Sequence, residues 1–172
     1  RTDLAKVNAW ALQFFRSNLA HESLGRPARD YLRGRGFSDT TIERFAVGLA
    51  VESGPSLKSA AGRAGFSDAT LVAADLLRQD EQTGRAYETF RSRVMFPIRD
   101  ATARVVGFGG RTLIDDKAKY LNTRQTALFD KGRNLYGIEL AREAIAARRR
   151  AIVVEGYTDC MACHQAGFLE TV

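Results

Sequence analysis

The chain has 172 residues, 45% of them hydrophobic, which fits one domain with a buried core or one domain and part of another. No apolar run approaches the ~20 residues of a membrane span, and no signal-peptide pattern is present, so we expect a cytoplasmic protein. The net charge of +6 is unevenly placed, because residues 91–135 hold ten Lys and Arg against four Asp and Glu. This excess predicts a basic face for a phosphate-bearing partner.

The front half of the chain is predicted to be mostly helical. Apolar residues recur at helical spacing over residues 4–19, and Trp10 and the Phe14–Phe15 pair are expected in the core. The segments Gly36–Ile42 and Gly65–Leu71 are alike, and each predicts a serine-capped helix start with a hydrophobic staple. Three helices are expected at residues 4–19, 27–36 and 57–64, and two more begin after Ser38 and Ser67. One strand is expected at residues 45–51.

Strands dominate the next part. Residues 93–99 and 104–111 predict a β-hairpin, and residues 85–90 approach a further strand. Pro97 favours an edge strand or a bulge. Three glycines in the second hairpin strand indicate close approach of a ligand or another element: Gly107, Gly109 and Gly110. Two polar, basic loops and an amphipathic helix are expected at residues 117–122, 128–136 and 138–149.

The segment Ala151–Glu155 is the strongest local indication of a functional site. Apolar residues lead directly into Glu155, and Gly156 and a helix-like segment follow. The pattern predicts a buried strand that presents a carboxylate at its C-terminal end, where open α/β sheets bind ligands. A charged residue at a strand end that only faces water fits the local pattern equally well.

The string Cys160-Met-Ala-Cys163-His164 matches the pattern of covalent haem attachment. We reject haem, because covalent attachment implies an export route and because residues three apart in a helix simply share a face. A zinc site is equally weak, since His21 and His164 are the only histidines that could add ligands. We expect two reduced thiols, partly in the core.

Five motifs occur in order along the chain: Arg91–Arg99, Gly107–Arg111, Lys119–Asn122, Phe129–Gly137 and Glu155–Asp159. Together with Tyr31–Gly36 and Ile42–Ala46, and in this order, they resemble the RNA-polymerase core of bacterial DnaG-type DNA primases, and the resemblance covers most of the chain. The resemblance implies an α+β / α/β fold. Residues 1–130 would form a mixed helical and β N-terminal subdomain, and residues 131–172 the first strand and helix of a Toprim α/β subdomain.

On this resemblance Glu155 is a catalytic residue, either as a ligand of the metal or as the group that helps deprotonate the 3′-hydroxyl, and Asp159 supports the site. Carboxylates suit the Mg²⁺ or Mn²⁺ that nucleotidyl transfer uses. The family's remaining ligands are aspartates on later strands, which we expect beyond Val172. An upstream zinc-binding domain and a downstream helicase-binding domain are also expected outside this chain, so the chain alone is expected to be inactive.

The resemblance further implies contacts with ribonucleoside triphosphates, a single-stranded DNA template and an RNA–DNA hybrid at the bacterial replication fork. Arginine suits bidentate phosphate binding, and such contacts fix position without reading sequence. The residues expected to contact nucleotide or template are Arg35, Arg91, Arg93, Arg111, Lys119, Asn122, Lys131 and Tyr157.

Two other classes of function remain open. A non-catalytic module that binds single-stranded nucleic acid needs only the basic face and no metal. Another Toprim enzyme, a topoisomerase or a nuclease, uses the same subdomain. A type IA topoisomerase, however, needs a nucleophilic tyrosine in a separate domain and usually carries its Toprim segment near the start of the chain.

Overall fold

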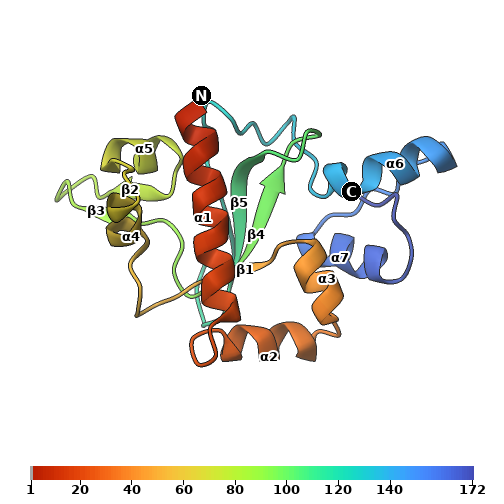
Figure 1. The fold of residues 1–172 in the computed structure, drawn as a ribbon, viewed down its shortest axis with the longest axis horizontal. Helices are drawn as coiled ribbons and strands as arrows, with labels where there is room; N and C mark the ends of the chain where they lie inside the picture. Colours follow the sequence, from red (N-terminus) through yellow and green to blue (C-terminus); the bar gives the residue numbers. More distant parts are fainter. Residues whose placement is uncertain (1) are drawn as a thin grey trace.

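The computed structural model describes residues 2–172. The helices are α1 (Thr2–Ala20), α2 (Arg26–Gly34), α3 (Asp39–Arg44), α4 (Leu57–Arg63), α5 (Asp68–Ala73), α6 (Ile138–Arg148) and α7 (Tyr157–Gln165). The strands are β1 (Gly48–Ala50), β2 (Leu77–Gln79), β3 (Ala86–Glu88), β4 (Arg93–Arg99), β5 (Val105–Thr112) and β6 (Tyr120–Asn122). The mixed α+β class expected from the sequence is confirmed (Figure 1).

The centre of the fold is an antiparallel sheet in the order β1-β4-β5-β6. Strands β4 and β5 form the predicted hairpin, with a register shift between Ile98 and Arg99. Strand β1 pairs with β4 only over Arg93–Met95. Pro97 therefore lies where β4 has a single neighbour, β5, and its missing N–H breaks no ladder bond.

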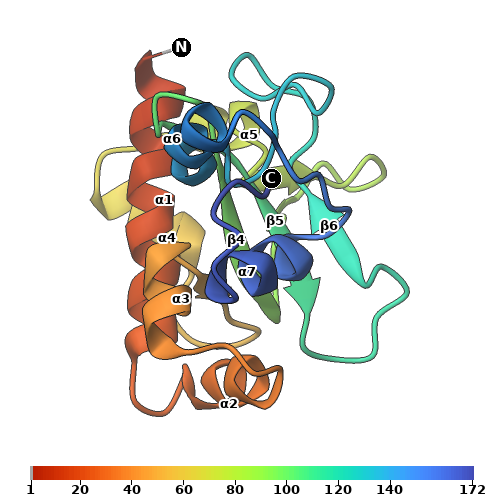
Figure 2. The same cartoon turned by 90° about the vertical axis from the view of Figure 1, so that its right-hand side faces the viewer.

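Helix α1 covers one face of this sheet, and α7 lies against the other (Figures 1 and 2). Phe15 is buried and meets Phe108 of β5 edge to face at 5.3 Å. The expectation for Trp10 and Phe14 is met only in part, because both rings are half-buried and stack on each other at the rim of the core.

Local capping agrees with the sequence pattern. The Ser38 hydroxyl accepts the Thr41 N–H at 3.1 Å, and the Ser67 hydroxyl accepts the Thr70 N–H at 3.2 Å, so both repeated segments start helices. Two short elements differ from expectation. Residues 117–122 were predicted as loop but contain β6, because the open edge of β5 offers ladder partners, and β2 was not predicted.

The predicted buried strand at Ala151–Glu155 is wrong in its burial. Only an isolated parallel bridge forms, between Ile152 and Thr171, and Val153 is 72% exposed. Among residues 2–172 the backbone of this segment bonds only with residues 170–172, and Val154 packs against the core while Val153 faces away from it, so one edge and one face remain uncovered. Within residues 2–172 no helix is both long and apolar enough to cross a membrane.

Candidate functional site

A cavity of about 660 Å³ lies between β6, the loop that precedes α6, the end of the 151–155 segment and the first turn of α7. Residues that are distant in the chain meet there. Among the residues expected from the sequence, the cavity is lined by Arg35, Lys119, Asn122, Lys131, Glu155, Tyr157 and Asp159.

The two carboxylates of the cavity differ in whether they have a partner within the protein. Asp159 Oδ2 accepts the Gly156 N–H at 3.2 Å, so Asp159 caps the start of α7, where the helix dipole also favours its charge. Glu155 is exposed, and none of the ion pairs among residues 2–172 involves it. Its carboxylate is therefore free to meet a ligand.

A divalent cation such as Mg²⁺ prefers about six oxygen ligands. Within residues 2–172 no group of three or more His, Cys, Asp or Glu side chains is arranged to hold a metal ion. Glu155, exposed in the cavity, fits one ligand position, whereas Asp159 is engaged in its helix cap. The described residues thus form no complete metal site by themselves.

Three cations converge on the cavity from separate elements. Arg35 follows α2, Lys119 precedes β6, and Lys131 lies in the loop before α6. All three side chains are exposed. Cations held around one cavity, beside a free carboxylate, suit a polyanionic ligand that carries phosphate groups.

The other three predicted basic residues lie elsewhere. Arg91 is exposed and pairs with Glu52 at 2.9 Å, outside the cavity. Arg93 is 4% exposed and bonded within the protein. The half-buried Arg111 places its guanidinium 4.7 Å from the centre of the Tyr31 ring, and Arg35 approaches the same ring at 5.9 Å. Arg111 thus lies outside the cavity and shares the Tyr31 ring with Arg35, which lines the cavity.

Tyr157 is held in place by three other side chains. Its hydroxyl donates to Asn122 Oδ1 at 2.6 Å, and its ring stacks on Phe96 at 5.2 Å and meets Tyr136 edge to face at 4.8 Å. Burial raises the pKa of Tyr157 to about 12, so the phenol stays protonated. The ring fills the space above Gly109, which confirms the expected close approach of another element.

The sequence analysis missed Tyr120 and Tyr136 as residues that line the cavity, and Tyr31 as the ring that Arg35 and Arg111 contact. Tyr120 and Tyr136 line the cavity and belong to two of the motifs, so their place there was the available signal. Both cysteines are reduced. Cys160 is buried, and burial raises its thiol pKa to about 12, which leaves it an inert core residue.

Comparison with known proteins gives consistent matches. A model of the "DNA primase catalytic core, N-terminal domain" family matches residues 14–142. The DNA primase of Deinococcus radiodurans is 49% identical over 170 residues, which are 99% of this chain and 29% of that protein. The RNA polymerase domain of the Mycobacterium tuberculosis primase DnaG superposes with a TM-score of 0.91 at 40% identity, over 99% of this chain and 55% of that one. A DnaG primase catalytic domain bound to ssDNA gives a TM-score of 0.87 at 40% identity, over 99% and 55%.

Proposed function

Because the chain belongs to the family of the DNA primase catalytic core, N-terminal domain, we propose that it is part of an enzyme that synthesises short RNA primers on a single-stranded DNA template. The chain spans 29% of the length of the D. radiodurans primase, so the proposed activity is that of the intact protein. Within it, residues 1–130 form the N-terminal subdomain and residues 131–172 the beginning of the Toprim subdomain.

The observation that carries the proposal is the cavity, where three cations surround an exposed carboxylate. Primer extension joins a 3′-hydroxyl to the α-phosphate of a nucleotide and releases pyrophosphate, and negative charge grows on the phosphoryl oxygens. Arg35, Lys119 and Lys131 bind and neutralise those oxygens. The Asn122 amide adds a donor, because its Oδ1 already accepts from Tyr157.

Glu155 would hold one coordination position of a Mg²⁺ or Mn²⁺ ion, whose chemistry is to stabilise charge on the reacting phosphate. Its further ligands come from elsewhere in the intact protein. The ligands of the cavity are ribonucleoside triphosphates, with template and RNA–DNA hybrid along its basic rim. We further propose that the intact protein carries a zinc-binding domain and contacts a replicative helicase. Its proposed location is the bacterial cytoplasm.

Lys131→Ala in the intact protein tests the nucleotide site. Lys131 is exposed and lines the cavity, so its loss should weaken ATP binding about tenfold, as expected for one charge-assisted hydrogen bond. Lys6→Ala is the matched control, because Lys6 is an exposed lysine of α1 that lies outside the cavity. Titration calorimetry measures both. Equal ATP affinities in the two variants would contradict the assignment of the cavity.

One observation favours a second candidate, a non-catalytic module that binds single-stranded nucleic acid. The described residues hold no complete metal site, while the basic lining alone suffices for phosphate binding. Titration of Mn²⁺ into the intact protein separates the two. Specific binding that Glu155→Gln weakens supports the enzyme, and its absence supports the module. Membership of the primase family argues against a topoisomerase or a nuclease.

A further inference from the structure

The cavity depends on a strand that is weakly held by the sheet itself. Strand β6 has three residues and pairs only with β5. Yet it carries Asn122, and Lys119 directly precedes it, so its position sets the spacing of two groups in the cavity. A three-residue edge strand with one neighbour opens readily unless side chains hold it.

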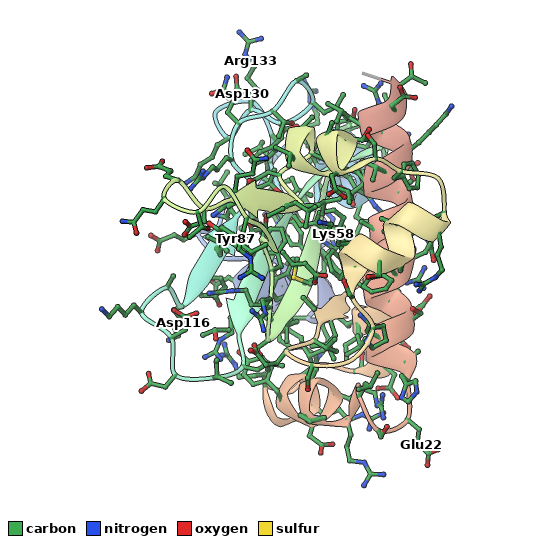
Figure 3. All side chains as sticks on the ribbon, turned by 90° about the vertical axis from the view of Figure 1, so that its left-hand side faces the viewer. Glu22, Lys58, Tyr87, Asp116, Asp130 and Arg133 are labelled. Carbon is green, nitrogen blue, oxygen red and sulfur yellow. The ribbon has the colours of Figure 1, made fainter. Side chains whose placement is uncertain are left out.

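One side chain holds the beginning of β6 from the face that α1 covers. Arg93 of β4 is 4% exposed, and its Nη1 donates to the carbonyl oxygens of Lys119 and Gly110, each at 3.3 Å. Its Nη2 donates to Asp116 Oδ2 at 3.0 Å. Asp116 lies on the loop between β5 and β6 (Figure 3), so Arg93 ties this loop and the entry of β6 to β4.

A second side chain holds the end of β6 from the opposite face. Gly109 and Asn122 are cross-strand partners, and the Tyr157 ring lies over Gly109 with its hydroxyl on Asn122 Oδ1 at 2.6 Å. Phe96, the partner of Gly109 on β4, stacks flat on the same ring at 5.2 Å. Tyr157 therefore ties β6 to the start of α7.

The consecutive glycines of β5 make both contacts possible. A Cβ on Gly109 would lie 2.4 Å from the Tyr157 ring, and one on Gly110 would lie 3.0 Å from Arg93 Cδ. Neighbouring residues of a strand point to opposite faces, so each glycine admits one of the two side chains.

We infer that Arg93 and Tyr157 form a two-sided clamp on β6, and that they act as positioning residues that fix Lys119 and Asn122 at the nucleotide cavity. Arg93 does this while buried and without contact to nucleic acid. Asp116 holds the Arg93 guanidinium in place. The functional half of this inference rests on the proposed nucleotide site, whereas the clamp itself is a property of the fold.

The test uses hydrogen exchange of the intact protein, read by mass spectrometry on peptides that cover residues 113–123. Tyr157→Phe removes only the hydroxyl, and Asp116→Asn weakens the hold on Arg93 without emptying the core. Each should speed exchange of this segment about tenfold, the equivalent of one hydrogen bond, and leave α1 unchanged. The matched controls are Tyr87→Phe, at an exposed tyrosine of β3, and Asp115→Asn, at the exposed neighbour of Asp116.

Steady-state kinetics of primer synthesis completes the test. The two clamp variants should raise KM for nucleoside triphosphate about tenfold and change kcat much less, because the binding groups and not the reacting ones are displaced. Unchanged exchange at residues 113–123 in both variants overturns the clamp. Faster exchange with an unchanged KM supports the clamp and contradicts the nucleotide site, so the two failures are distinguishable.

Discussion

Gly109 shows at the scale of one residue how a missing side chain determines where another residue lies. The Tyr157 ring occupies the space that a Cβ on Gly109 would fill. The sequence predicted that a ligand or another element approaches closely here, because glycine is costly in a strand. It did not predict which residue approaches. Tyr157 lies 48 positions further along the chain, and no local pattern pairs the two.

Gly109→Ala should therefore destabilise the protein by about 1–3 kcal/mol, the usual cost of overpacking a core. The new methyl group would lie 2.4 Å from the Tyr157 ring, and that ring is held by Phe96 and Tyr136. Gly62→Ala is the control, because Gly62 lies within α4 and has nothing within 4 Å of its Cβ position. Gly62→Ala should be neutral or stabilising. Thermal unfolding that shows equal stability of the two variants would contradict the packing described here.

The six predicted basic residues differ in where the fold places them. Six were assigned one role from the motifs, yet the structure gathers Arg35, Lys119 and Lys131 at the cavity and buries Arg93 in the fold. A motif shows that a residue type recurs at a position, but exposure depends on neighbours that are distant in the chain. The contact role predicted for Arg91 and Arg111 stays a prediction.

At the scale of elements, periodicity and caps predicted most of the fold. The long first helix, the two serine-capped helices and the β4–β5 hairpin follow from local patterns and are confirmed. Strand β6 was not predicted, and segment 151–155 was wrongly predicted to be a buried strand, because the state of both depends on which edges and faces have neighbours. An apolar sequence alone does not reveal that residues 170–172 are the single partner of that segment.

Helix α7 also contains a titratable group in the core. His164 is 5% exposed, contacts the Phe45 ring edge to face at 5.0 Å, and lies 2.8 Å by its Nε2 from the Thr171 carbonyl oxygen. Burial lowers its pKa below 6.5, and Arg44 adds to this, while Thr171 and Glu170 oppose it. The His164 imidazole therefore binds a proton more readily in the unfolded chain than in the folded protein.

The contribution of neutral His164 to stability should thus be fully present above the unfolded pKa of about 6.5. It should be lost as pH falls below that value toward the lower pKa of the folded state. The measurement is the unfolding temperature at about pH 7.5 and about pH 5, where the protein should be less stable at the lower pH. His164→Phe should reduce this difference, and His21→Gln, at the exposed histidine, should preserve it. An identical pH dependence in His164→Phe and the unaltered protein would exclude His164 as the cause.

At the scale of the whole molecule, the sheet lies between α1 and α7 (Figure 2). The cavity lies beside the first turn of α7 and the edge strand β6. The residues that line it range from Arg35 to Val172, so the cavity exists only in the folded chain. The end of α6 is joined to the core by Glu170, which is 0% exposed and pairs with Arg148 and Arg150. Arg148 and Arg150 thus neutralise this buried carboxylate.

The central claim is that the free carboxylate in this cavity serves primer synthesis. Glu155→Gln in the intact protein tests it most directly, because the change removes the charge at an exposed position and preserves shape. Template-directed incorporation of labelled ribonucleotides should fall at least about a hundredfold. Single-stranded DNA binding and the unfolding temperature should stay unchanged, and Glu143→Gln, at an exposed position of α6, should retain full activity. Synthesis within about twofold of the unaltered protein in Glu155→Gln would contradict the claim.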